Sequence, residues 1–519
     1  MIRVVTDLTK YELDIRAVIN MFYRDKSVVF ADNQDECKDE WFLFIEQKRK
    51  TIVTRLVVTD NSYESVLNLK LDEDFLLDDK YDEQPFAKEL IYSREVKNKI
   101  KSTIYDVFAQ HTGYKSKWGT LTGVRPAKLA FLMKKNGMDN EGCIRTLKEE
   151  YLCSEEKARL ITQIAWHEYD KVKEYVHADN YSLYIGIPFC PTTCLYCSFA
   201  SNPVAGNQKA VKEYLEALYK EMELTADSIR DKKLVSVYIG GGTPTALNCE
   251  EIEDLLHKIK TEFNLNRIIE YTVEAGRPDS ITKEKLLVLK KYGVTRISIN
   301  PQVMDDEVLS VIGRRHSVDD VIEKYNLARE LGFDNINMDL IMGLPRQTVS
   351  IADDTLSKII KLNPESVTVH TLTLKKNSKL THYLEAYSDM MDDNVEIMVN
   401  AAREALTQRE YMPYYLYRQK NITSHLENVG YSKAGYECIY NILMMEEMQT
   451  IVACGAGTIS KKVNNPMLLF EGETGVLPRI ERHDNPKNLK DYIDKIDYIT
   501  DKKIRFLKRD GACYGNNDK

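Results

Sequence analysis

Three cysteines lie within eight residues of one another, in Cys190-Pro-Thr-Thr-Cys194-Leu-Tyr-Cys197. They follow a strand-like run, YSLYIGI at 181–187, so a single tight loop would present all three thiols. Thiolates of this kind bind zinc or an iron–sulfur cluster. A structural zinc site needs a fourth ligand, and the nearest histidine and the next cysteine are poorly placed along the chain. Three ligands leave one metal position open, which favours a catalytic [4Fe-4S] cluster over zinc.

Two further motifs end the next two strand-like runs. Gly240-Gly-Gly-Thr-Pro-Thr245 follows the run at 234–240, where glycines let the backbone approach a ligand closely. By itself this string is also consistent with a tight turn. Glu274 ends the apolar run at 268–275, and a carboxylate there is costly to bury unless it meets a cation. Both motifs are therefore candidate ligand contacts.

Three polar side chains continue this series. Gln302 follows the run at 295–300, Arg314 comes twelve residues later, and Asp339 ends the run at 335–341. Alone, Arg314 is equally consistent with a charge on a helix surface and Asp339 with a helix N-cap. Together with the cysteine loop, the glycines and Glu274, they follow the ends of successive strands. In a parallel barrel these ends form one face, the catalytic face, which predicts one shared site.

The elements that must position these residues alternate between strands and helices. Six strand-like runs are expected at 181–187, 234–240, 268–275, 295–300, 335–341 and 366–372. Amphipathic helical patterns separate them at 211–230, 249–263, 281–293, 317–332 and 350–363, with Ser317 and Ser350 as capping residues and Gly293 and Gly332 as terminal glycines. Six strands with five helical crossovers require a parallel sheet. The fold class is α/β, and a partial (β/α)6 TIM-like barrel is favoured over a doubly wound sheet by the site motifs.

The rest of the chain suggests three parts. Residues 1–175 combine short strand-like pieces, such as 51–60, with helices, and predict an accessory α/β domain. Residues 176–395 form the core, and residues 396–519 predict a mainly helical C-terminal domain. Of 519 residues 43% are hydrophobic, and 72 basic against 80 acidic residues give a net charge of −8, which argues against indiscriminate nucleic-acid binding. We expect no membrane span, no signal peptide, and a cytoplasmic location, with which the scattered remaining cysteines agree.

The cysteine motif YxxIPFCPTTCLYC resembles the radical S-adenosylmethionine (SAM) superfamily. With the motifs above, the stretch from about Tyr184 to Ile459 is similar to the oxygen-independent coproporphyrinogen III oxidase family, and most similar to its HemZ-type branch. The resemblance implies that Cys190, Cys194 and Cys197 hold the [4Fe-4S] cluster and that SAM chelates its open iron. It also implies SAM contacts from Tyr184, Gly241, Gly242, Thr243, Glu274, Gln302, Arg314 and Asp339. Tyr196, Thr373 and Ile459 align with residues near a second SAM, although each is equally well a packing residue.

The implied activity is oxidative decarboxylation of coproporphyrinogen III to protoporphyrinogen IX. An electron from the reduced cluster would cleave SAM to a 5′-deoxyadenosyl radical, which removes a hydrogen from a substrate propionate before carbon dioxide leaves. The electron donor would be a flavodoxin or ferredoxin, with neither membrane nor nucleic acid as a partner. Lys375, Lys376, Arg418 and Lys420 are candidate partners of the substrate carboxylates, and equally well solvated surface charges.

The sequence departs from the family patterns at three informative places. Gly186 stands where many relatives carry a histidine, and a serine and a phenylalanine follow Cys197 where a well-known oxidase has a fourth, non-ligand cysteine two residues on. A related branch of haem chaperones carries a histidine in a motif that corresponds here to residues 440–445, where no histidine occurs. Two alternatives stay open: a haem-binding or haem-delivery protein without decarboxylase activity, and a radical SAM enzyme that acts on another tetrapyrrole.

Overall fold

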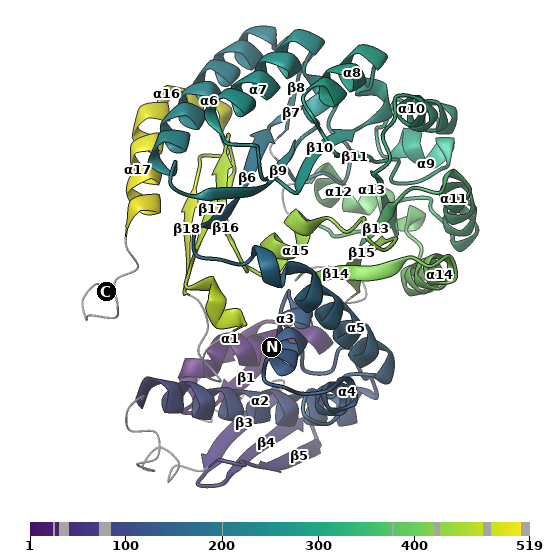
Figure 1. The fold of residues 1–519 in the computed structure, drawn as a ribbon. Coiled ribbons are helices and arrows are strands. Elements are labelled where there is room, and N and C mark those ends of the chain that lie inside the picture. Colours follow the sequence, from purple (N-terminus) through teal and green to yellow (C-terminus); the bar gives the residue numbers. More distant parts are fainter. Residues whose placement is uncertain are drawn as a thin grey trace. The chain divides into compact units, whose positions relative to one another are not determined.

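The computed structural model describes residues 1–23, 26–30, 41–71, 85–199, 201–375, 378–419, 426–470 and 479–509. They form two units (Figure 1). The first spans Met1–Trp166, and the second joins His167–Phe470 to residues 479–509. Among the described residues, no helix is both long and apolar enough to cross a bilayer.

The first unit is an α/β domain, as the sequence predicts. Its sheet has the order β2-β1-β3-β4-β5, from β1 (Ile2–Val5), β2 (Val28–Phe30), β3 (Trp41–Lys48), β4 (Thr51–Val58) and β5 (Asn61–Asn68). Apolar side chains alternate along β3 and β4 and pack against helices α1 (Glu12–Phe22) and α2 (Pro85–Thr112), with Ile15, Ile45 and Phe108 fully buried. Helices α3 (Pro126–Lys135), α4 (Asn140–Glu149) and α5 (Glu155–Val172) follow.

The second unit contains the six predicted strands in one sheet. They are β6 (Asn180–Ile187), β9 (Lys233–Gly241), β10 (Glu270–Gly276), β11 (Arg296–Ile299), β12 (Ile336–Met342) and β13 (Ser366–Thr371). All are parallel, and each pairs with the next one in chain order. A doubly wound sheet would reverse this order at a switch point. The sequential order therefore establishes the partial barrel.

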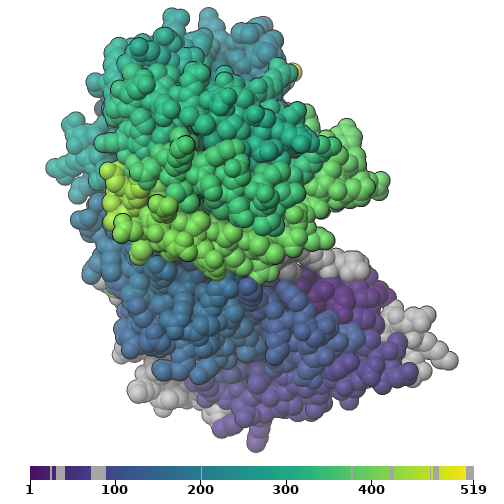
Figure 2. Space-filling model, turned by 90° about the vertical axis from the view of Figure 1, so that its right-hand side faces the viewer, coloured from purple at the N-terminus to yellow at the C-terminus, as the bar shows by residue number. Residues whose placement is uncertain are grey.

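Helices follow the strands around the outside of the barrel (Figure 1). They are α6 (Gln208–Ser228), α7 (Cys249–Glu262), α8 (Lys283–Lys291), α10 (Val318–Glu330) and α11 (Val349–Leu362), all within the predicted ranges or a few residues outside them. Ser317 caps α10 as predicted, but the cap of α11 is Thr348 and not Ser350. The short helix α9 (Asp306–Val311) was not predicted. Figure 2 views the second unit from the side on which α10 and α11 lie in Figure 1, and these helices contribute to the green surface.

The C-terminal part corrects one prediction, because it is not mainly helical. It contributes β14 (Met412–Arg418), β15 (Glu427–Ser432), β16 (Thr450–Cys454), β17 (Ile459–Asn464) and β18 (Arg479–Asp484). Strand β15 pairs antiparallel with β13 and β14 pairs antiparallel with β15, whereas β16 pairs parallel with β6 at the opposite edge. Helices α14 (Val395–Thr407), α15 (Ile439–Met445), α16 (Leu489–Asp494) and α17 (Ile496–Lys508) accompany them. The residues that follow β13 thus supply the strands that extend both edges of the barrel sheet, all within the second unit. The division at 175 and 395 stays a prediction.

A buried ion pair fixes helix α17 to the barrel. Glu221 of α6 and Lys503 of α17 are both fully buried and in contact. The Glu221 carboxylate also accepts hydrogen bonds from Gly455 N at 2.8 Å, Asn485 Nδ2 at 2.7 Å and Tyr492 Oη at 2.5 Å. Burial favours the neutral amine, but Cys454 and the Glu221 carboxylate outweigh it and raise the pKa of Lys503. The network holds α17 and the turn after β16 against α6.

Candidate active site

The three cysteines lie in a loop whose two ends are hydrogen-bonded together. The loop leaves β6 through β7 (Phe189–Cys190) and returns through β8 (Asn202–Pro203), which pairs with β7. Asn202 N donates to Pro188 O at 2.9 Å and Val204 N donates to Cys190 O at 3.1 Å. This closure holds the cysteine-bearing residues at the carboxyl end of β6, the edge at which the sequence predicted the site.

The donor set suits a cubane cluster. Cys190 and Cys194 are buried, Cys197 is half-buried, and all three thiols are free. Burial raises the pKa of the Cys197 thiol, and the nearby Cys194 and Cys190 thiols raise it further. In the described part of the chain, no three His, Cys, Asp or Glu side chains surround a position for a single ion. A zinc ion needs such a cage, whereas a cubane binds one thiolate at each iron. The arrangement therefore fits a [4Fe-4S] cluster better than zinc.

The glycines that follow β9 pack directly against the cysteine loop. Gly241 has φ +113°, a conformation that L side chains rarely adopt. A Cβ atom at Gly242 would lie 2.4 Å from Phe189 O and 3.0 Å from Cys190 Sγ. Thr243 N donates to Phe189 O at 2.7 Å, and the Thr243 hydroxyl lies 3.5 Å from Cys190 Sγ. The requirement for glycine is thus a close approach of two backbones, which brings residues 241–243 beside Cys190.

Glu274 lies at the end of β10 beside a group of stacked tyrosines. Tyr238 donates to Glu274 Oε1 at 2.6 Å, and its ring stacks on Tyr440 at 4.6 Å and on Tyr184 at 6.0 Å between centroids. Burial raises the pKa of Glu274 to about 7, and the Asp339 carboxylate contributes to the rise. The hydrogen bond from Tyr238 acts in the opposite direction and lowers this pKa. A carboxylate in this setting is poised to receive a cation.

Sequence reasoning missed two members of this tyrosine group. Tyr238 could have been found, because it lies two residues before Gly240 and therefore on the same face of the strand. Tyr440 comes from α15, and no local signal connects it with β9. The group brings Tyr184 and Glu274, both predicted, into one cluster.

Gln302 and Asp339 are adjacent on the next two strand ends. Gln302 N donates to Asp339 O at 2.9 Å, with Gln302 at φ +69°. Gln302 is 7% exposed, and its Oε1 has no hydrogen-bond partner among the residues that the structure describes, so the amide is available to a ligand.

Asp339 is charged and held by its neighbours. Asn337 Nδ2 donates to Asp339 Oδ1 at 2.7 Å, and His370 Nε2 lies 3.9 Å from Oδ2. Burial opposes the charge, but His370 and Asn337 keep the pKa of Asp339 below its usual range. His370 Nδ1 lies 3.2 Å from the Tyr417 hydroxyl on β14, so the C-terminal strands support this edge of the site. Neither His370 nor Tyr417 was predicted.

Arg314 joins the cysteine loop to the loop that follows β11. Its Nη2 donates to the Tyr196 hydroxyl at 3.2 Å and its Nη1 donates to Asn300 O. Leu195 N donates to Ile312 O at 3.0 Å, and Thr192 Oγ1 donates to Gly313 O at 3.3 Å. These contacts place Arg314 and Tyr196, both predicted, in one hydrogen-bonded group with the cysteine loop.

Other predicted residues are less closely associated with this group. Thr373 follows β13, and its hydroxyl donates to Thr371 O at 3.3 Å. Ile459 begins β17 and is 40% exposed. Lys375 lies over the Phe199 ring at 5.5 Å, next to Cys197, and Arg418 is buried at the end of β14. The remaining two candidate carboxylate partners, Lys376 and Lys420, lie outside the described residues.

Steric crowding explains why position 186 is a glycine in this chain. A Cβ atom at Gly186 would lie 2.5 Å from Thr458 Cγ2, in the turn between β16 and β17. A histidine at this position is thus excluded by the turn that packs against β6. The departure from the family pattern is therefore coupled to the C-terminal strands.

Gly186→Ala is expected to lower the free energy of unfolding by about 1–3 kcal/mol, the usual cost of overpacking. Thr458→Ser removes the opposing methyl group and keeps the hydroxyl that donates to Gly455 O. The double variant Gly186→Ala/Thr458→Ser should therefore recover most of the loss. Chemical denaturation monitored by circular dichroism measures both effects, and additive losses in the double variant would contradict the explanation.

Comparison with known proteins decides the family. The sequence model of the Radical SAM superfamily matches residues 184–359. The oxygen-independent coproporphyrinogen-III oxidase-like protein HemZ of Bacillus subtilis is 43% identical over 420 residues, which cover 80% of this chain and 82% of that protein. The chain belongs to this HemZ-type family. It is accordingly a radical SAM protein, and its cofactors are a [4Fe-4S] cluster and SAM.

Further relatives of this HemZ-type chain carry a different description. The heme chaperone HemW of Haemophilus influenzae is 31% identical over 309 residues, which cover 59% of this chain and 74% of that protein. The coproporphyrinogen III oxidase HemN of Escherichia coli is similar in structure, with a TM-score of 0.50 at 22% identity over 65% of this chain and 73% of that one. The likeness to HemN shows a shared fold.

Proposed function

We propose that this protein decarboxylates the propionates of coproporphyrinogen III to vinyl groups and so yields protoporphyrinogen IX. The observation that carries the proposal is the 43% identity to HemZ, an oxidase-like protein, over four fifths of this chain. The cluster and SAM supply a carbon-centred radical that can remove a hydrogen atom from the substrate. The protein would then position the propionate, neutralise its charge and exclude water.

The proposed cofactor contacts follow the strand ends in order. Cys190, Cys194 and Cys197 would ligate the cluster. SAM would contact Tyr184, Gly241, Gly242, Thr243, Glu274, Gln302, Arg314 and Asp339. The unpartnered Gln302 Oε1 and the protonatable Glu274 support this assignment, because both leave hydrogen-bonding or charge capacity for a ligand. Tyr196, Thr373 and Ile459 would serve a second SAM.

SAM affinity is expected to rise with pH through the titration of Glu274. Because the pKa of Glu274 is raised to about 7, its carboxyl is largely protonated at pH 6 and ionised at pH 8. SAM carries a sulfonium cation, so binding should favour the ionised form and tighten about tenfold between pH 6 and pH 8. Equilibrium dialysis with the reconstituted protein measures this change. Glu274→Gln should bind SAM weakly at both pH values, and a tenfold change that persists in this variant would argue against the assignment.

Substrate carboxylates need cations near the cluster. Lys375 lies beside Cys197, and Arg418 ends the strand that carries Tyr417, a neighbour of His370. Both are proposed partners of the propionates. We further propose a cytoplasmic enzyme that receives its electrons from a flavodoxin or ferredoxin.

A second function is favoured by the HemW relatives. The protein would then bind or deliver haem and lack the decarboxylase activity. The position of Tyr440 argues against haem ligation at that place, because this side chain is buried and stacks on both Tyr184 and Tyr238. A third function, a radical SAM reaction on another tetrapyrrole, fits the same cofactor site.

One assay separates the decarboxylase from the other two functions. The anaerobic, cluster-reconstituted protein is incubated with SAM, a reductant and coproporphyrinogen III, and 5′-deoxyadenosine and porphyrins are quantified by mass spectrometry. Substrate-dependent deoxyadenosine together with vinyl products would establish the decarboxylase. Deoxyadenosine formed at the same slow rate with and without substrate, and no vinyl product, would rule it out. Haem titration and a panel of other tetrapyrroles would then distinguish the remaining two functions.

A further inference from the structure

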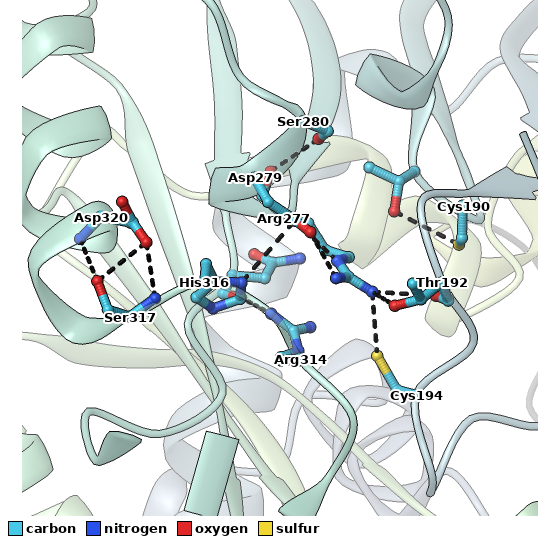
Figure 3. Close-up of polar contacts among 12 residues, drawn as sticks. Cys190, Thr192, Cys194, Arg277, Asp279, Ser280, Arg314, His316, Ser317 and Asp320 are labelled. Atoms are coloured by element: carbon cyan, nitrogen blue, oxygen red, sulfur yellow. Dashed lines mark hydrogen bonds and ion pairs between the residues drawn. The ribbon is translucent and has the colours of Figure 1, made fainter. Parts of the chain in front are cut away.

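Beside the cysteine loop, three charged or titratable side chains contact one another in series, and the proposed reaction does not use them. Arg277, Asp279 and His316 are drawn together in Figure 3, with Cys194 at one end. Arg277 comes directly after β10 and is 2% exposed. Its Nε and Nη2 donate to the two oxygens of Asp279 at 2.9 and 2.6 Å. This bidentate pair fixes the plane of the guanidinium group.

The remaining guanidinium nitrogen is directed at the cysteine loop (Figure 3). Arg277 Nη1 donates to Thr192 O at 3.0 Å, to Thr192 Oγ1 at 2.6 Å and to Cys194 Sγ at 3.9 Å. Thr192 lies midway between the first two cysteines of the motif. One buried cation thus contacts both the backbone that spaces these cysteines and a sulfur atom assigned to the cluster.

Asp279 is itself held in its ionised form. Burial opposes its charge, but His316 and Arg277 outweigh burial and keep the pKa of Asp279 well below its usual range. His316 Nδ1 lies 3.8 Å from Asp279 Oδ1, and the His316 side chain is fully buried. The carboxylate can therefore hold Arg277 in place throughout the neutral pH range.

We propose that Arg277 is a positioning residue for the cluster, which orders residues 192–194 and donates a charge-assisted hydrogen bond to the Cys194 thiolate. Hydrogen bonds and positive charge near the sulfurs stabilise the more negative, reduced state of a cluster, and so raise its reduction potential. The Asp279 carboxylate anchors the donor and limits the size of this effect. The proposal rests on the cluster site of the family and is independent of which tetrapyrrole is the substrate.

Arg277→Met in the reconstituted holoprotein is the test. At a fixed solution potential, the ratio of reduced to oxidised cluster should be about tenfold lower in the variant than in the unsubstituted protein. This corresponds to a midpoint about 59 mV lower for a one-electron couple. A redox titration followed by electron paramagnetic resonance measures the midpoint without any substrate, so the result is separate from the decarboxylase assay. Iron and sulfide are quantified in the same samples.

Two further variants make the result specific. Arg277→Lys keeps the positive charge but loses the bidentate guanidinium group. Its midpoint potential is expected to lie between those of Arg277→Met and the unsubstituted protein. Arg230→Met is the matched control, since Arg230 is an exposed arginine paired with Asp227, and its midpoint should not change. An unchanged midpoint in Arg277→Met at full iron content would overturn the proposal. So would loss of the cluster in both Arg277 variants with an intact fold, because Arg277 would then be needed only to build the loop.

Discussion

Cys194→Ala is expected to reduce SAM cleavage by more than about 100-fold, because even the loss of a supporting partner of a metal site costs 10–100-fold. Cys194 is buried in the loop between β7 and β8, which also carries Cys197, and Cys190 ends β7. Two thiolates leave two irons of a cubane without a protein ligand. Iron and sulfide analysis after anaerobic reconstitution, followed by quantification of 5′-deoxyadenosine, measures the loss.

Cys249→Ala is the matched control for this experiment. Cys249 is the first residue of α7 and lies outside the cysteine loop. Its replacement should leave the iron content and the rate of SAM cleavage unchanged. A Cys194→Ala protein that retained the full cluster and cleaved SAM at the original rate would contradict the ligand assignment.

Lys503→Met is expected to lower the free energy of unfolding of the second unit by about 3–5 kcal/mol. The loss arises because the fully buried Glu221 carboxylate loses the cation that compensates it. Gly455, Asn485 and Tyr492 would still donate to the carboxylate, but none of them carries a positive charge. Chemical denaturation monitored by circular dichroism gives the shift.

The double variant Glu221→Gln/Lys503→Met tests whether the uncompensated charge is the cause. Removing both charges should restore a large part of the stability, because a buried pair replaced by neutral groups is often nearly neutral in its effect. Lys495→Met provides a control, since Lys495 is exposed and pairs with Asp491, four residues earlier, and it should leave the midpoint unchanged. A double variant less stable than Lys503→Met would show that packing and not charge dominates.

The barrel could be predicted from sequence because each of its strands and helices has a local signal. β-Branched runs bounded by turn residues marked all six strands, and helical periodicity marked the helices between them. The strand order could not be predicted in this way, since a doubly wound sheet has the same succession of elements. The C-terminal strands were missed because β16 is only five residues long and its partner β6 lies far back in the chain. Both Thr348 and Ser350 are residue types that can cap α11. The backbone conformation determines which of them does so, and in the structure it is Thr348.

The site was predictable where chemistry coincides with a strand end. The rule that selected Glu274 looks for charged residues at a strand end. It would also have selected Arg277 and Asp279, had it been applied to the residues just after the strand in EAGRPD. Tyr440 and Tyr417 reach the site from the C-terminal strands and helix α15, so only the fold connects them with Tyr238 and His370.

The pairing of β16 with β6 has a consequence for the order of events on the ribosome. The cysteine loop follows β6 at once during synthesis, but the strand that covers the free edge of β6, Thr450–Cys454, is translated much later. Until then the nascent chain exposes an unpaired, largely apolar edge strand beside three free thiols. We therefore expect the barrel edge beside the cysteine loop to close only after β16 has been translated.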